Sequence, residues 1–131
     1  METYMNFRVD NDKLIMIVDD EPMMVSFIEK ILIDEGYRIV TAGDGNTALQ
    51  LISKEEPDLI LLDIRMPGAD GVSTLERIRQ LTNAPVIMVT GLGGDDLIER
   101  SIDTGADDFI RKPFRPNELL ARIKAKLRRH R

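Results

Sequence analysis

The hydrophobic positions of this chain alternate between short continuous runs and stripes with the period of a helix. The continuous runs predict strands at residues 14–18, 38–42, 58–62, 85–89 and 108–111. The stretches after them repeat their apolar residues every three or four positions and predict helices at residues 22–35, 46–54, 71–81, 95–104 and 116–129. Three of the strands are almost wholly apolar, which is typical of strands covered on both faces.

The order of these elements is strand then helix, five times over. Such alternation predicts an α/β fold in which right-handed crossovers place helices on both faces of a parallel sheet. The length of 131 residues suits one domain with a single core. We place this domain at residues 13–131 and expect residues 1–12, which are polar and irregular, to form a flexible N-terminal extension.

Composition narrows the class of protein. Cysteine is absent, which excludes disulfides and thiolate metal sites. No apolar stretch is long enough to cross a bilayer, and the first residues, Met1-Glu2-Thr3-Tyr4, do not resemble a signal peptide. These features favour a cytoplasmic location and no membrane partner.

Charge is unevenly spread along the chain. The formal net charge is −5, yet residues 111–131 hold nine Lys or Arg and a single acid, Glu118. A basic last helix could contact nucleic acid or an anionic membrane. Positive charge at a helix C-terminus is also favourable by itself. We prefer the second interpretation, because the domain as a whole is acidic and would repel DNA.

Carboxylates stand where predicted strands end. Asp19 and Asp20 follow the run 14–18, and Asp63 follows the run 58–62. The carboxyl ends of parallel strands meet at one edge of the sheet, so the three side chains should converge. Crowded carboxylates repel one another unless a cation joins them or some are protonated. A hard divalent cation is therefore expected, and Mg²⁺ is the first candidate.

Each carboxylate also has a simpler interpretation. Asp19 or Asp20 could cap the helix that begins at Pro22, although this explains two adjacent carboxylates less well than one. Asp63 could be a turn residue before a loop rich in Pro and Gly. In the functional interpretation Asp63 is a nucleophile that accepts a phosphoryl group as an acyl phosphate, with a metal offsetting the charge.

Three further residues are candidates at or near the same edge. The Thr90 hydroxyl could donate to a phosphoryl oxygen or be only a strand-end group. Lys112 could be a solvated surface charge or could pair with Asp63 and later with a phosphoryl group. The bond from Lys112 to Pro113 could be cis, although X–Pro bonds are usually trans. Phe109 could be a buried strand aromatic or part of a switch.

Taken in order, these segments resemble the receiver domain of two-component response regulators, the CheY-like superfamily. The resemblance covers about residues 13–129. Each motif is weak alone, but their order and spacing together are specific. The matching segments are Val18-Asp19-Asp20-Glu21-Pro22, Leu62-Asp63, Met66-Pro67, Asp70-Gly71, Val89-Thr90 and Gly105-Ala106-Asp107-Asp108-Phe109-Ile110-Arg111-Lys112-Pro113-Phe114.

The resemblance implies a flavodoxin-like (βα)5 fold, a three-layer sandwich whose parallel sheet has the order 2-1-3-4-5. It implies that a histidine kinase donates a phosphoryl group to Asp63. The chain would catalyse only this transfer onto itself and the later hydrolysis, and so would not be an enzyme in the ordinary sense. Mg²⁺ would be bound by Asp20, Asp63 and the backbone carbonyl of Arg65, with Asp19 assisting through water.

The resemblance also implies a switch. Thr90 and Lys112 would hold the phosphoryl oxygens, and Phe109 would turn inward when Thr90 moves toward the phosphate. Two features depart from the usual pattern. Phe109 stands where many relatives have tyrosine, so no hydroxyl is available there, and the segment Gly91-Leu92-Gly93-Gly94 is unusually rich in glycine, which predicts a mobile loop.

The end of the chain is similar to receivers of the OmpR/PhoB subfamily, which carry a winged-helix DNA-binding domain. Asp107, Asp108 and Arg122 match positions that such receivers use to form a homodimer through the fourth helix, fifth strand and fifth helix. DNA would then be bound only by an output domain outside this chain. The alternative is a single-domain phosphorelay regulator.

A rival from another class is a metal-dependent phosphohydrolase with an aspartate nucleophile. Such an enzyme needs a second acid–base carboxylate near the nucleophile and a cap over its substrate. Here Ile64 and Arg65 follow Asp63, and no insertion is long enough to form a cap. The sequence therefore favours the receiver.

Overall fold

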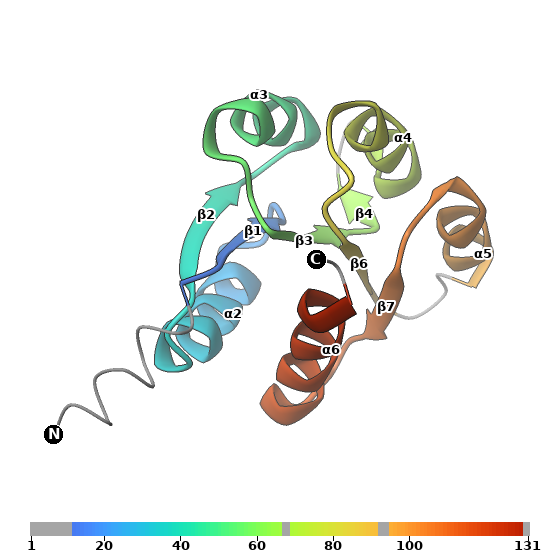
Figure 1. Cartoon of the computed structure of the whole chain (residues 1–131). Coiled ribbons are helices and arrows are strands. Elements are labelled where there is room, and N and C mark those ends of the chain that lie inside the picture. The colour runs from blue at the N-terminus through green and yellow to red at the C-terminus, as the bar shows by residue number, and fades with distance from the viewer. Residues whose placement is uncertain (1–11, 67–68, 92–94, 130–131) are drawn as a thin grey trace, which may run out of the picture.

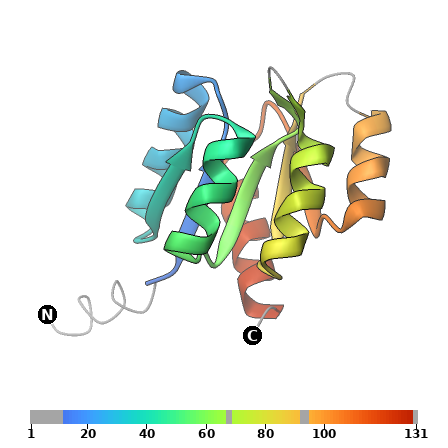
Figure 2. The same cartoon turned by 90° about the horizontal axis from the view of Figure 1, so that it is seen from above.

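The computed structural model describes residues 12–66, 69–91 and 95–129. These residues form three layers, with a parallel sheet between two layers of helices (Figures 1 and 2). Along the sheet the strand order is β2-β1-β3-β6-β7. Counting only these five strands along the chain, the order is 2-1-3-4-5, which confirms the flavodoxin-like α/β fold.

The main elements lie close to their predicted positions. The strands are β1 (Leu14–Val18), β2 (Arg38–Ala42), β3 (Leu59–Asp63), β6 (Val86–Thr90) and β7 (Asp108–Arg111). The helices are α2 (Pro22–Asp34), α3 (Gly45–Glu55), α4 (Gly71–Leu81), α5 (Asp95–Thr104) and α6 (Pro116–Arg129). A short antiparallel pair, β4 (Arg65–Met66) with β5 (Ala69–Asp70), was not predicted, since two-residue strands leave no periodic signal.

The apolar strands supply two separate cores. In Figure 1, α2 and α6 cover one face of the sheet, and α3, α4 and α5 cover the other. Ile15 and Ile17 belong to the first core, and Met16 and Val18 belong to the second. Successive residues of a strand point to opposite faces, so a strand between two helical layers must be apolar throughout.

Two strands extend one residue beyond the predicted run. Asp63 is the last residue of β3 and pairs in register with Val89, while Thr90 is the last residue of β6 and pairs with Arg111. A polar side chain interrupts the hydrophobic pattern, but its backbone can still pair with the neighbouring strand. The two polar groups are therefore held by the sheet, not by the loops that follow it.

Some predictions concern residues outside those described. The flexible extension was predicted at residues 1–12, of which the structure describes only Asp12. The predicted mobile loop at Gly91-Leu92-Gly93-Gly94 is described only at Gly91. Within the described ranges, none of the helices combines the length and apolar character required to span a bilayer.

Candidate functional site

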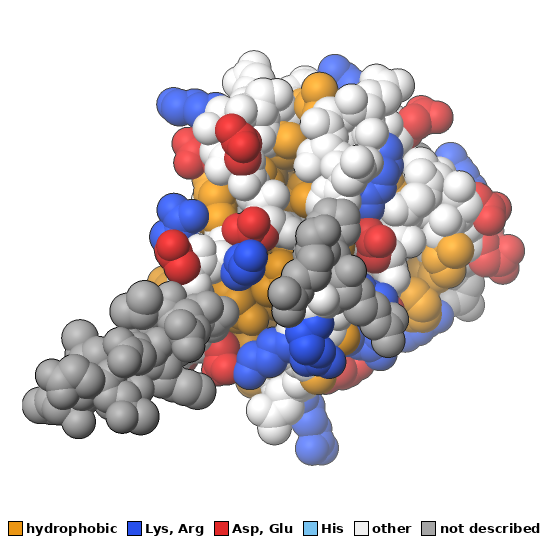
Figure 3. Space-filling view, in the orientation of Figure 1, with side chains coloured by type: hydrophobic (Ala, Val, Ile, Leu, Met, Phe, Trp, Pro, Cys, Tyr) orange, Lys and Arg blue, Asp and Glu red, His pale blue; other side chains and the backbone are white. Residues whose placement is uncertain are grey.

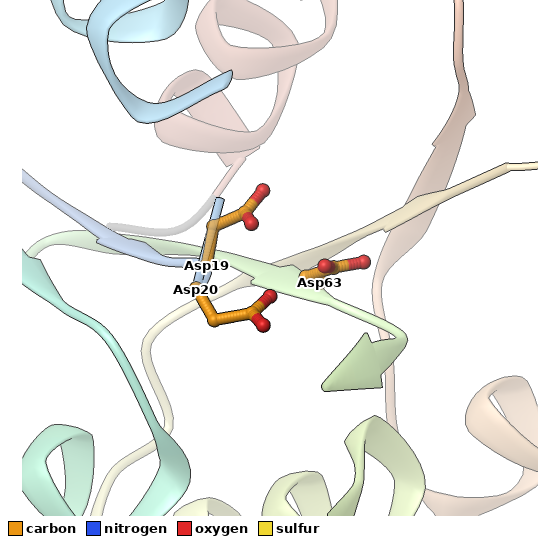
Figure 4. Close-up of side chains that lie close together, drawn as sticks. All are labelled: Asp19, Asp20 and Asp63. Atoms are coloured by element: carbon orange, nitrogen blue, oxygen red, sulfur yellow. The ribbon is translucent and has the colours of Figure 1, made fainter. Parts of the chain in front are cut away.

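The carboxylates of Asp19, Asp20 and Asp63 converge at the carboxyl edge of the sheet (Figure 4). Each offers an oxygen that lies within 4.8 Å of the oxygens of the other two. They come together because β1 and β3 are hydrogen-bonded neighbours, with Val18 opposite Leu62. This convergence confirms the expectation drawn from strand ends.

Asp19 is fixed by the turn that joins β1 to α2. Its Oδ1 accepts a hydrogen bond of 2.9 Å from the backbone N–H of Glu21, and its own N–H donates to the carbonyl of Ala42 at 3.0 Å. The N-cap of α2 is Glu21, which makes no side-chain capping bond. The prediction that Asp19 or Asp20 caps this helix is therefore wrong, because Asp19 binds the cap residue itself and not the first turn of the helix.

The three carboxylates differ in exposure. Asp19 and Asp63 are buried, whereas Asp20 is exposed to solvent. Burial raises the pKa of the Asp19 carboxyl, and the charges of Asp20 and Glu21 add to this. The Glu21 N–H and the Lys112 ammonium act in the opposite direction but do not cancel the effect of burial. The ionised cluster is thus unfavourable when no cation is bound.

The donor chemistry of the cluster fits a hard divalent cation. Carboxylate oxygens are the ligands that Mg²⁺ prefers, and Mg²⁺ typically uses only a few of them and keeps several waters. Because Asp20 is exposed, a cation bound by the cluster would be accessible to such waters. A bound cation would also offset the repulsion from Asp20 and Glu21, which adds to the effect of burial on the pKa of Asp19.

Lys112 lies beside the carboxylates. Its Nζ is 3.8 Å from Oδ1 of Asp63 and 3.9 Å from Oδ2 of Asp19. Its backbone N–H donates to the carbonyl of Thr90 at 2.6 Å, and its peptide bond to Pro113 is cis. The interpretation of Lys112 as a solvated surface charge is therefore wrong, since its side chain pairs with both buried carboxylates.

Thr90 lies at the same edge, one residue beyond Val89, the register partner of Asp63. Its side chain is fully buried. The hydroxyl donates to the carbonyl of Gly91 in a long bond of 3.3 Å. This weak bond leaves the hydroxyl available for a better acceptor.

Phe109 is half-buried and packs against the core between the sheet and helices α3, α4 and α5. The guanidinium carbon of Arg111 lies 5.8 Å from the centre of its ring, within the range of a cation–π contact. This contact of Arg111 was not predicted from the sequence. The signal was present, since residues two apart on a strand point to the same face.

The charged residues expected at a dimer face are paired within the chain. Arg122 Nη1 lies 3.0 Å from Oδ1 and 3.1 Å from Oδ2 of Asp108. Asp107 accepts from Arg79 at 2.6 Å and from the Val86 N–H at 2.8 Å. Asp107 thus ties α4 to the start of β6 and β7, a role that the sequence analysis did not predict.

The basic character of the last helix is visible on the surface. In Figure 3, Lys and Arg side chains gather on the part of the molecule built by α6, and acidic side chains lie among them. Lys124 of this helix forms an ion pair of 2.6 Å with Glu35. Part of the positive charge on α6 is therefore already paired with acids of the same domain.

Comparison with known families agrees with this geometry. The family model described as response regulator receiver domain matches residues 15–124. Among solved structures, NtrX from Brucella abortus is similar, with 36% identity over 89% of this chain and a TM-score of 0.84. This chain spans only 27% of that NtrX chain.

Two other similar structures are of nearly the same length as this chain. The CheY-like receiver domain protein from Methanospirillum hungatei shows 36% identity over 90% of this chain and 95% of its own, with a TM-score of 0.86. The receiver domain of Francisella response regulator 1452 shows 31% identity over 92% of this chain and 100% of its own, with a TM-score of 0.83. These matches do not single out the OmpR/PhoB subfamily.

Proposed function

We propose that this chain, which belongs to the response regulator receiver domain family, accepts a phosphoryl group from a histidine kinase on the carboxylate of Asp63. The observation that carries the proposal is the position of Asp63, buried at the end of β3 beside two other carboxylates and 3.8 Å from the Lys112 ammonium. Receiver domains are signalling domains and not enzymes that act on a separate substrate.

The proposed reaction is a transfer between two side chains. A carboxylate oxygen of Asp63 attacks the phosphorus of a phosphohistidine, and the P–N bond breaks with its electron pair left on the imidazole. An acyl phosphate forms, and water later hydrolyses it to the free carboxylate and inorganic phosphate. The reactive bond belongs to the phosphoryl donor. The chain therefore contributes the position of the Asp63 carboxylate and the charges that stabilise the transferred group.

We assign the metal site to Asp20, Asp63 and the backbone carbonyl of Arg65, with Asp19 assisting through water. Bound Mg²⁺ supplies positive charge beside the Asp63 carboxylate and the incoming phosphoryl oxygens. Asp19 is held in place for this role by the N–H of Glu21. Arg65 begins β4 directly after Ile64, so its carbonyl follows closely on Asp63 in the chain.

We assign Thr90 and Lys112 to the phosphoryl oxygens. The Lys112 ammonium already lies against Asp63, and a phosphoryl group would offer it a stronger acceptor. The Thr90 hydroxyl would exchange its 3.3 Å bond for one to the phosphoryl group. Movement of Thr90 would free space that the ring of Phe109 then fills, and the change would reach the face formed by α5, β7 and α6.

The output of this switch belongs to the proposal as well. We assign the chain to the OmpR/PhoB type, cytoplasmic, with a homodimer through α5, β7 and α6 and DNA bound by an output domain outside this chain. A receiver that is part of a longer regulator has a counterpart in NtrX, of which this chain spans 27%. The single-domain phosphorelay alternative has a counterpart in the Methanospirillum hungatei protein, of which it spans 95%.

The test is labelling with a small phosphodonor such as acetyl phosphate in the presence of Mg²⁺. Intact-mass spectrometry should show one added phosphoryl group on the wild type and none on Asp63→Asn. Asp103→Asn is the control, because Asp103 is an exposed acid on α5, outside the cluster. Stoichiometric labelling of Asp63→Asn would overturn the assignment of the acceptor.

A further inference from the structure

The first residue of α4 lies directly against the backbone of the acceptor strand. Gly71 is buried, and its N–H donates a short bond of 2.7 Å to the carbonyl of Ile64. A Cβ built on Gly71 would lie 2.7 Å from the carbonyl oxygen of Asp63, 2.7 Å from Cα of Ile64 and 3.0 Å from its carbonyl oxygen. All three atoms belong to the backbone, so no side-chain rotation can relieve the contact.

We propose that Gly71 is a positioning residue for Asp63. Its missing side chain lets α4 begin against the peptide that joins Asp63 to Ile64, and this contact sets the orientation of the Asp63 carboxylate. The inference rests on the proposed function, since it concerns the residue assigned as the phosphoryl acceptor. The proposed site then includes a backbone contact of Gly71, in addition to the side chains assigned to the metal and the phosphoryl group.

The other side of the same peptide is held by the sheet. Asp63 pairs in register with Val89, and the Ile64 N–H donates to the Val89 carbonyl at 3.0 Å. The peptide is therefore clamped between β6 and the start of α4. A methyl group at Gly71 would lie 2.7 Å from its nearest backbone atoms. This distance would have to increase to about 3.4 Å to give an ordinary van der Waals contact. A positioning role for Gly71 requires that part of this displacement falls on Asp63.

Such a displacement matters because the site depends on close spacing. The three carboxylates have oxygens within 4.8 Å of one another, and Lys112 lies 3.8 Å from Asp63. Removal of groups that orient metal ligands commonly lowers metal affinity by about 10–100-fold. We therefore expect Gly71→Ala to weaken Mg²⁺ binding roughly tenfold or more and to slow labelling by acetyl phosphate.

Gly45 provides a matched control. It is the first residue of α3, as Gly71 is of α4, and a Cβ on Gly45 would also meet its nearest atom at 2.7 Å. That atom is the Thr74 hydroxyl oxygen, and all three nearest atoms belong to the Thr74 side chain. Gly45→Ala therefore introduces an equally close contact without pressing on the backbone of Asp63.

The experiment compares the wild type, Gly71→Ala and Gly45→Ala as full 131-residue chains. Calorimetry gives the Mg²⁺ affinity, intact mass gives the labelling rate, and urea unfolding gives the metal-free stability. Amide chemical shifts of Asp63 and Ile64 report directly on the backbone. We expect both variants to lose stability, and only Gly71→Ala to lose Mg²⁺ affinity and labelling rate and to shift these amides.

The outcomes separate this inference from the proposed function. If the wild type is never labelled, the proposed function fails, and the Mg²⁺ affinity and the amide shifts still decide the role of Gly71. If the wild type is labelled and Gly71→Ala matches Gly45→Ala in affinity, rate and amide shifts, the positioning role is wrong. If Gly71→Ala is largely unfolded, the comparison is repeated in sucrose, which favours the compact state, and is judged by the same criteria.

Discussion

The side-chain ammonium of Lys112 lies 3.8 Å from Oδ1 of Asp63, although Asp63 ends β3 and Lys112 follows the end of β7. The same ammonium is 3.9 Å from Oδ2 of Asp19. Lys112 therefore offsets part of the negative charge of the cluster when no metal is present. A bound cation would neutralise the same carboxylates as Lys112. The effect of Mg²⁺ on stability should therefore depend on whether Lys112 is present.

Lys112→Met should lower the metal-free stability by about 1 kcal/mol, because two buried carboxylates lose their cation while the aliphatic stem is kept. Addition of Mg²⁺ should then raise the melting temperature more than it does in the wild type, since the metal no longer competes with a nearby ammonium. Labelling by acetyl phosphate should slow. Thermal melts with and without Mg²⁺ and intact mass give these values.

Lys124→Met is the matched control for this prediction. Lys124 also pairs with a carboxylate, that of Glu35, but outside the site. Its loss should cost little, as is usual for exposed ion pairs, and should leave the Mg²⁺ effect unchanged. An equal Mg²⁺ effect in Lys112→Met and the wild type would argue against electrostatic overlap between lysine and metal.

Asp20→Ala should weaken Mg²⁺ binding while leaving metal-free stability equal or greater. Asp20 is exposed, and its charge adds to the repulsion around the buried Asp19. Removal of that charge relieves the metal-free cluster but takes away a proposed metal ligand. Thermal melts with and without Mg²⁺ test both halves. A marked loss of metal-free stability would show that Asp20 has a structural role in the turn.

The fold could be predicted from sequence because hydrophobic period and element length reflect burial directly. The strand runs and helix stripes gave most boundaries within one residue, and the strand ends placed three carboxylates together. The predicted ends of β3 and β6 fell one residue before Asp63 and Thr90. The hydrophobic pattern reflects the burial of side chains, so it does not show that a polar residue still belongs to the backbone hydrogen-bond ladder. Prediction also failed for contacts that depend on packing, such as those of Gly71, Arg111 and Asp107.

The capping of α3 predicts a pH dependence. Oδ1 of Asp44 accepts from the Thr47 N–H at 2.8 Å, and this bond holds the pKa of Asp44 below its ordinary value of 3.8. Ionised Asp44 therefore stabilises the fold above pH 3.8, and the stabilisation is lost as the pH falls through the lowered folded pKa. Asp44→Ala should be less stable than the wild type at pH 7, and this difference should shrink in acid.

Asp44→Asn separates the hydrogen bond from the charge. Asparagine keeps an oxygen acceptor for the Thr47 N–H, so it should retain much of the cap. It does not titrate, so its stability relative to Asp44→Ala should not change with pH. Urea unfolding of the three proteins at several pH values provides the test, and a constant difference between wild type and Asp44→Ala down to acid pH would contradict it.

The contact between Arg111 and Phe109 predicts that the ring of Phe109, the proposed switch residue, is restrained. Without a hydroxyl, Phe109 has no hydrogen bond to hold its ring, but the Arg111 guanidinium lies 5.8 Å from the ring centre. An exposed cation–π contact contributes about 0.5–1 kcal/mol, which corresponds to a change of about two- to fivefold in rotamer populations. Arg111→Ala should shift the Phe109 populations by this factor in carbon NMR. Unchanged populations would show that core packing alone fixes the ring.

The last prediction concerns dimer formation. Asp108 and Arg122 are paired within the chain, with Nη1 of Arg122 3.0 Å from Oδ1 of Asp108. A symmetric dimer through α5, β7 and α6 can use these charges only if the pair opens or is shared with a second copy. Beryllofluoride, a mimic of the acyl phosphate, should therefore convert the chain from monomer to dimer in sedimentation.

The variant Arg122→Glu should prevent this dimer while leaving binding of beryllofluoride intact, because Arg122 lies on α6, outside the carboxylate cluster. The double variant Asp108→Lys with Arg122→Glu keeps opposite charges at the two positions and should restore it. If the mimic binds to the wild type but the chain stays monomeric at high concentration, the dimer proposal is wrong. A phosphorylated monomer could then act only by presenting its altered face to a different protein, as a single-domain relay does.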